Sequence, residues 1–82
     1  MGETKQFKIE NQNEAEIKKI IQATYHALME KGYNPISQIV GYILTEDPTY
    51  ITTHNNARNM IRRVDRFELL QIMLKDFLKD AE

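Results

Sequence analysis

Four arginines lie close together in the second half of this 82-residue chain, where they are well placed to recognise an anionic group. Arg58, Arg62 and Arg66 are spaced four residues apart, with Arg63 beside one of them, and the segment 54–66 holds only one aspartate against the four. A planar guanidinium can donate two parallel hydrogen bonds to a carboxylate or a phosphate. The spacing therefore predicts either a docking face for an anionic or protein partner, or an ordinary solvated helix face.

Nucleic-acid binding is the alternative function that the same arginines raise. Two short helices around a turn, one of them basic, form the pattern of a helix-turn-helix protein. Against this reading, the whole chain carries a net charge of −1, and only Asn55, Asn56 and Asn59 accompany the arginines as base-reading side chains. We therefore expect a protein-docking face made by Arg58, Arg62 and Arg66, and no nucleic-acid partner.

The other chemistry-bearing residues do not predict an enzyme. The chain has no cysteine nucleophile, no serine in a nucleophile elbow and no glycine-rich loop for phosphate. His26 and Glu30 are four residues apart and would suit one side of a metal site, but no third ligand follows at a recognisable spacing. Asp47 precedes Pro48, which favours a helix cap over a general base. We expect no catalytic residue, no metal and no cofactor.

The helices that must position these side chains follow from the apolar pattern, which repeats every three or four residues from Glu14 onward. The cap and turn residues divide this pattern into a helix from Glu14 closed by Lys31 and Gly32, a helix from Pro35, a turn from Pro48, a helix capped by Thr52 or Thr53, and a helix or bend beginning at Asp65. The sequence therefore predicts an all-α fold, a compact bundle of four to five short helices. One helical domain is expected over residues 13–82, capped by Asn13, after a flexible tail over residues 1–12.

Two features of these helices predict close contacts. Gly41 lies in mid-helix, where it costs up to about 1 kcal/mol relative to alanine, so we expect another backbone to approach it. The last helix is apolar over more than half its circumference, which exceeds the need of one small core. Its apolar residues are Phe67, Leu69, Leu70, Ile72, Met73, Leu74, Phe77 and Leu78. A chain this short without a disulfide usually needs a partner chain, so we expect a homodimer.

The composition also predicts where the protein works. No apolar run approaches the roughly 20 residues that span a bilayer, and the first residues lack the apolar centre of a secretion signal. The expected location is the cytoplasm, without membrane insertion.

A long stretch of the chain resembles a known protein family. The sequence EKGYNPISQIVGYIL at residues 30–44 is similar to the central motif of the IreB/ReoM-like family. The similarity continues through Asp47–Ile51, and then through His54, Ala57, Arg58, Ile61, Arg62 and Arg66. It covers nearly the whole chain.

The resemblance implies a function that composition alone does not show. Members of this family are small helical homodimers of Gram-positive bacteria, and they are substrates of a membrane Ser/Thr kinase with extracellular penicillin-binding-associated repeats and of its partner phosphatase. They regulate cell-wall synthesis and cephalosporin resistance. In some members, the unphosphorylated form promotes turnover by Clp protease of the enzyme that commits sugar nucleotide to peptidoglycan.

Thr4 is the residue on which the resemblance places the kinase target. It is the only hydroxyl residue before Thr24, and a phosphate there would add a charge of roughly −1.5 to −2. Family targets precede an aromatic residue in the tail, as Thr4 precedes Phe7. The family arginines linked to regulatory output match Arg58, Arg62 and Arg66. A departure follows Ile51, where Thr52-Thr53 replaces the family's usual Pro-Arg and removes one basic residue.

Overall fold

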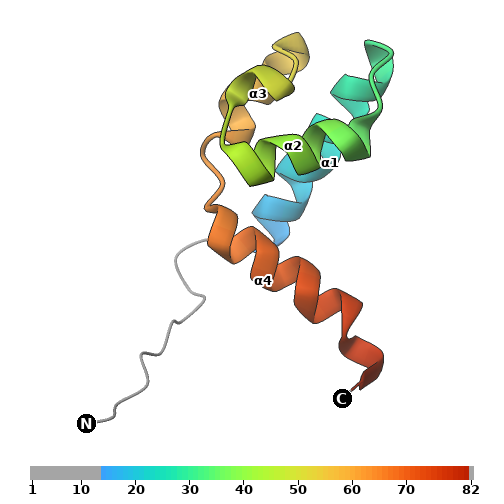
Figure 1. The fold of residues 1–82 in the computed structure, drawn as a ribbon, viewed down its shortest axis with the longest axis vertical. Coiled ribbons are helices and arrows are strands. Elements are labelled where there is room, and N and C mark those ends of the chain that lie inside the picture. The colour runs from blue at the N-terminus through green and yellow to red at the C-terminus, as the bar shows by residue number, and fades with distance from the viewer. Residues whose placement is uncertain (1–13, 82) are drawn as a thin grey trace, which may run out of the picture.

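The computed structural model describes residues 14–81, and every regular element within that range is helical (Figure 1). The α-helices are α1 (Glu14–Glu30), α2 (Pro35–Thr45), α3 (Ala57–Ile61) and α4 (Arg66–Phe77). Three short 3₁₀ turns accompany them, η1 (Pro48–Tyr50), η2 (His54–Asn56) and η3 (Lys79–Ala81). The predicted all-α class is confirmed. The expected tail and its Asn13 cap lie outside the described residues.

The end of α1 is the glycine-closed turn that the sequence predicts. Gly32 has a φ of +84°, in the left-handed region that glycine occupies without steric cost. Its amide donates to the Met29 carbonyl, and the Tyr33 amide donates to the Leu28 carbonyl, both at 3.0 Å. These two bonds satisfy carbonyls that the helix leaves open, and they reverse the chain toward α2.

Side-chain caps begin α2 and η1, also as predicted. Asn34 accepts a hydrogen bond from the Ser37 amide at 3.0 Å, and Pro35 follows it as the first helical residue. Asp47 accepts from the Thr49 hydroxyl at 2.7 Å and from the Thr49 amide at 3.0 Å. The hydrogen bonds from the Thr49 hydroxyl and amide hold the pKa of Asp47 below its ordinary value, because they stabilise the ionised form. Asp47 is therefore a cap, as expected from its place before Pro48.

The segment after η1 differs from the expected helix. Neither threonine caps an α-helix: Thr53 makes no capping bond, and the Thr52 hydroxyl instead accepts from the His54 amide at 3.1 Å. Asn55 and Asn56 have φ values of 54° and 63°, so two consecutive residues leave the right-handed helical path before α3 starts. Asparagine tolerates this conformation better than most residues because its short polar side chain can bond locally.

A second break follows almost at once, at Asp65. The Asp65 carboxylate accepts hydrogen bonds from the amides of Phe67 at 2.8 Å and Glu68 at 3.2 Å, so α4 starts as a new helix. Of the two expectations for this position, a restart and a bend, the structure has the restart. As a result α3 is only five residues long.

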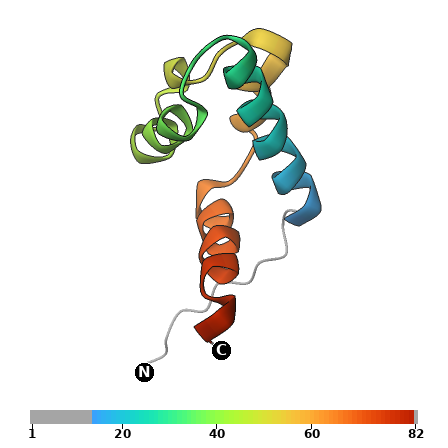
Figure 2. The ribbon, with the colours of Figure 1, turned by 90° about the vertical axis from the view of Figure 1, so that its right-hand side faces the viewer.

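The helices enclose a core in two parts. The larger part joins α1, α2 and α3 and contains Ala27, Leu28, Ile39, Tyr42, Ile51, Ala57 and Ile61. The smaller part brings α4 against the start of α1 through Ile17, Val64, Leu69 and Ile72. Figures 1 and 2 show α4 extending away from the other three helices, and the described residues span 49 × 27 × 21 Å.

Gly41 is closely approached, but by a side chain and not by the expected backbone. A Cβ built on Gly41 would lie 2.5 Å from Cε1 and 2.6 Å from Cδ1 of Tyr50. The Tyr50 ring, brought over α2 by η1, therefore occupies the space that any larger residue would need.

A Gly41→Ala variant is expected to be destabilised, although alanine is the better helix former. Overpacking of this kind costs typically about 1–3 kcal/mol, which outweighs a helix-propensity gain of at most about 1 kcal/mol. Urea unfolding followed by circular dichroism measures the change. The double variant Gly41→Ala/Tyr50→Ala should regain the helix-propensity gain relative to Tyr50→Ala alone. If Gly41→Ala instead raises the free energy of unfolding, the Tyr50 ring can move aside and its contact with Gly41 does not exclude a larger residue.

Candidate functional site

The three predicted docking arginines do not share one helix face. Because α3 ends at Ile61, Arg62 lies just beyond its last turn, and Arg66 is the first residue of α4. The regular spacing in the sequence therefore does not correspond to one continuous helix. Each arginine has its own surroundings, and these assign the three side chains different roles.

Arg58 is half-buried and holds the connection between α2 and α3. Its Nε donates to the Ile51 carbonyl at 2.8 Å. Beside it, Gln38 Nε2 of α2 donates to the Tyr50 carbonyl at 2.9 Å. Two consecutive main-chain carbonyls of the connection are thus fixed by side chains from the helices on either side.

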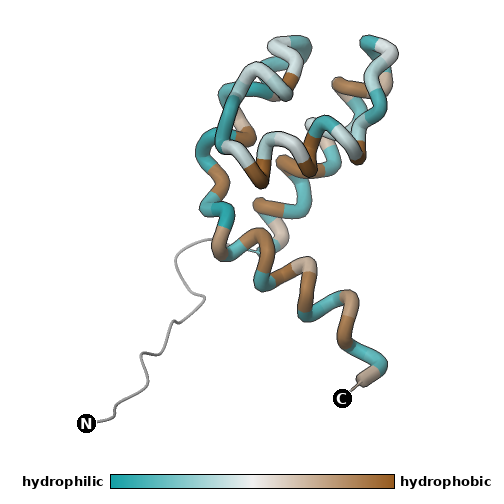
Figure 3. Tube along the Cα trace, viewed as in Figure 1, coloured by the Kyte–Doolittle hydropathy of each residue, from teal (hydrophilic) through white to brown (hydrophobic). Residues whose placement is uncertain are grey.

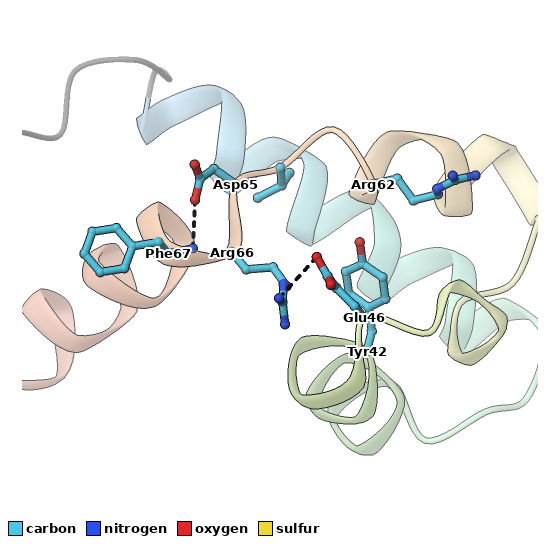
Figure 4. Close-up of a pocket in the computed structure, with 7 residues that line it drawn as sticks. Tyr42, Glu46, Arg62, Asp65, Arg66 and Phe67 are labelled. Carbon is cyan, nitrogen blue, oxygen red and sulfur yellow. Dashed lines mark hydrogen bonds and ion pairs between the residues drawn. The ribbon is translucent and has the colours of Figure 1, made fainter.

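Arg66 joins α4 to the end of α2. One guanidinium nitrogen donates to the Ile43 carbonyl. The other lies 3.1 Å from the Glu46 carboxylate, as the dashed line in Figure 4 marks. The Ile43 carbonyl is in the last turn of α2, where it has no partner within the helix. A cation is also favoured there by the helix dipole.

Arg62 is the exposed member of the three. Within residues 14–81, its guanidinium has no hydrogen-bond or ion-pair partner. Figure 4 shows it pointing away from Arg66, at one side of an open cleft of about 380 Å³. The cleft is lined by Tyr42, Glu46, Arg62, Val64, Asp65, Arg66 and Phe67. Its two arginines are matched by two carboxylates, so the cleft as a whole is not a strongly cationic pocket.

Glu30, which with His26 makes only an incomplete set of metal ligands in the sequence, contacts a residue far from it in the chain. Glu30 Oε1 lies 2.7 Å from His54 Nε2, which connects the end of α1 to η2. The His26 ring instead stands edge-on to Tyr25, with ring centroids 5.5 Å apart. No group of three or more potential metal-binding side chains occurs in the described part of the chain.

An exposed apolar surface on α4 is the other candidate site. Leu70, Met73, Leu74 and Phe77 line one shallow hollow, and their exposed fractions range from 47% for Leu70 to 82% for Phe77. Figure 3 shows this helix as largely hydrophobic along its length, even where it has left the core. A patch of this kind on a small protein usually marks an interaction surface. We call these four residues the α4 apolar face.

A second apolar row lies on α2. Ile36, Val40 and Leu44 recur every four residues and are 62%, 47% and 76% exposed, while Ile39 and Ile43 of the same helix turn inward. The apolar residues of this helix are therefore divided between the core and the surface. No helix among residues 14–81 combines the length and apolar character needed to cross a bilayer.

The fold and these surfaces define a small all-helical protein with exposed apolar and arginine-bearing surfaces suited to protein contacts. The family model described as IreB regulatory phosphoprotein matches residues 2–79, so the chain belongs to that family and the predicted resemblance is confirmed. Family membership supports a regulatory role.

Curated relatives agree with this assignment and match over nearly their whole length. The chain is 52% identical over 80 residues to a UPF0297 protein of Ruminiclostridium cellulolyticum, covering 98% of this chain and 91% of the relative. It is 51% identical to a UPF0297 protein of Acetivibrio thermocellus, with coverage of 98% and 89%. A UPF0297 protein of Lachnoclostridium phytofermentans is 46% identical over 78 residues, with coverage of 95% and 89%.

Proposed function

We propose that this protein is a non-enzymatic, cytoplasmic regulatory phosphoprotein whose switch is phosphorylation of Thr4 by a membrane Ser/Thr kinase. A partner phosphatase reverses the modification, and the output controls peptidoglycan synthesis and, through it, cephalosporin resistance. The observation that carries this proposal is the match of residues 2–79 to the IreB regulatory phosphoprotein family, because that range includes Thr4.

The proposed output surface is the arginine cluster of Arg58, Arg62 and Arg66. The exposed, unpaired guanidinium of Arg62 supports direct contact with a partner, since its donors are not used within the described chain. Arg58 and Arg66 are bonded to main-chain carbonyls, which supports a role in holding the surface in shape. A component of the Clp protease machinery, or an enzyme delivered to it, is the proposed downstream partner.

The protein is proposed to act as a homodimer. The α4 apolar face supports this, because side chains such as Phe77 are largely exposed in the single chain. Burying them against a partner would remove apolar surface from water and so favour association. The small size of the chain argues in the same direction.

The test of the switch is to phosphorylate the purified protein with a cognate kinase and map the sites by mass spectrometry. Thr4 is expected to carry the phosphate, and Thr4→Ala should abolish the modification. Modification mainly at Thr24, Thr45, Thr49, Thr52 or Thr53, with Thr4 untouched, would contradict the proposal. Thr24 is an internal reference for unfolding, because it is fully buried and its hydroxyl donates to the Ile20 carbonyl at 2.8 Å.

A pull-down then links the modification to the partner. Wild type, Thr4→Ala and Thr4→Glu serve as baits under identical conditions. A set of captured proteins that differs between Thr4→Ala and Thr4→Glu is expected. Identical capture by all three baits, and by wild type before and after phosphorylation, would remove Thr4 as the regulator of binding.

A further inference from the structure

The direction of α4 depends on few contacts with the rest of the molecule. Its buried apolar residues are Leu69 and Ile72, both in its first two turns, and residues 73–77 are exposed. Figure 2 shows the helix projecting from the other three. Residues 62–65, which connect α4 to α3, are not part of either helix, so the two helices are not continuous. Something other than a large hydrophobic interface must therefore contribute to its angle relative to α2.

We infer that Glu46 and Arg66 form a positioning pair that fixes the direction of α4 relative to α2, and with it the presentation of the α4 apolar face. Arg66 opens α4, and both of its partners belong to the last turn and cap of α2. Its guanidinium reaches the Ile43 carbonyl and the Glu46 carboxylate at once. A planar guanidinium that bonds to two acceptors at once restricts orientation as well as distance, which a lysine ammonium would not do.

The backbone of Glu46 supplies an independent argument. Glu46 caps α2 with φ 62° and ψ 15°, and its amide donates to the Tyr42 carbonyl at 2.7 Å. This left-handed cap position favours glycine or asparagine, because a Cβ is unfavourable there. The cap bond uses only the backbone, so a glycine would form it without the steric cost. The glutamate side chain is therefore explained by its contact with Arg66 and not by capping.

The solvent exposure of the Glu46–Arg66 pair indicates that it affects geometry more than stability. The side chain of Arg66 is 34% exposed and that of Glu46 is 64% exposed, so water and salt weaken their attraction. A pair this exposed adds little to the overall stability of the fold. Its effect is on geometry: the α2–α4 angle should be held in the wild type and become variable when the pair is removed.

The absence of cysteine from the chain makes the test direct, because two cysteines can be introduced and spin-labelled without a background. Ser37 on α2 and Lys75 on α4 are both exposed and suit the labels. Double electron–electron resonance spectroscopy then gives the distribution of distances between the labels on α2 and α4 of one chain. An excess of unlabelled protein is added so that distances between labels on different chains do not contribute. The full-length chain is used throughout.

Three substitutions and one control are measured on this background. Glu46→Gly, Glu46→Gln and Arg66→Gln are expected to broaden the distribution, and Arg66→Gln most, because it also loses the bond to Ile43. Arg62→Gln is the matched control, since it removes an arginine from the same cleft that has no side-chain partner among residues 14–81, and its distribution should equal that of the wild type. Glu46→Gly is the decisive variant, because it keeps the backbone hydrogen bond of the cap and removes the steric cost of a Cβ in the left-handed conformation.

The outcomes separate positioning from simple stabilisation. A folded Glu46→Gly chain with an unchanged melting temperature or a higher one, and with a broader α2–α4 distribution, supports the inference. A distribution identical to wild type in both Glu46 variants overturns it, and would leave Arg66 as a cap of α2 alone. The measurement needs no kinase, so it succeeds or fails independently of phosphorylation at Thr4.

Discussion

A chain carrying both Leu70→Glu and Leu74→Glu is expected to be a 9.7 kDa monomer at concentrations where the wild type forms the proposed dimer. The two leucines are one helical turn apart on the α4 apolar face, and they are 47% and 57% exposed in the single chain. Covering an apolar side chain contributes about 1.5–3 kcal/mol, and a carboxylate buried without a partner costs several kcal/mol more. The combined loss corresponds to a dissociation constant raised by at least about 100-fold.

Sedimentation velocity or light scattering over a concentration series measures this change. The matched control is Lys75→Gln/Lys79→Gln, which alters the net charge by the same amount on exposed positions of the same segment. This control should remain dimeric, and helical content should be the same in all three proteins. A wild type that is already monomeric at micromolar concentration would remove the homodimer from the proposed function.

A second pair of variants separates the structural arginine from the exposed one. Arg58→Ala is expected to lower the free energy of unfolding by about 2–3 kcal/mol, because the buried Ile51 carbonyl loses a charged donor and the arginine stem is lost from the packing. Arg62→Ala should change the free energy of unfolding by no more than about 0.5 kcal/mol, as is usual for an exposed side chain such as this one, which has no partner in the described part of the chain.

Urea unfolding of the two variants, followed by partner capture at a temperature where both are folded, completes the comparison. Arg62→Ala should lose capture at unchanged stability, which is the behaviour of a direct docking residue. Equal losses in the free energy of unfolding for both variants would show that the hydrogen bond from Arg58 to the Ile51 carbonyl does not contribute to stability. Full capture by Arg62→Ala would move the docking surface elsewhere, with the α4 apolar face as the next candidate.

The parts of the fold that could be predicted from the sequence are those determined by neighbouring residues. Asn34, Asp47 and Asp65 each bond to an amide two or three positions ahead, and Gly32 closes α1 through carbonyls within one turn. Such interactions depend on short sequence separations, so residue type and order are enough to find them. The excess of apolar surface on the last helix was visible for a similar reason, because helical periodicity is a local property.

Most of the misses are contacts between different secondary-structure elements, and one is the local break at Asn55 and Asn56. The side chain over Gly41 comes from Tyr50 in η1, beyond the end of α2, and Glu30 contacts His54, 24 residues further along the chain. Spacing also suggested one arginine row, but it cannot show that Arg58 and Arg66 bind the carbonyls of Ile51 and Ile43. The left-handed conformation of Asn55 and Asn56 depends on neighbouring residues, since asparagine favours it. It was missed because the apolar residues around this position follow a helical spacing.

The division of the core into two parts has a consequence for the order in which the molecule assembles. The part shared by α1, α2 and α3 joins elements that follow one another along the chain, so only short loops must close to form it. The part that holds α4 pairs Leu69 and Ile72 with Ile17, near the opposite end of the described chain, and that loop cannot close cheaply until the first three helices have shortened it. We therefore expect α4 to dock late in folding and to detach early in unfolding, so that the helix with the exposed α4 apolar face is the one that the other three helices could release while they stay folded.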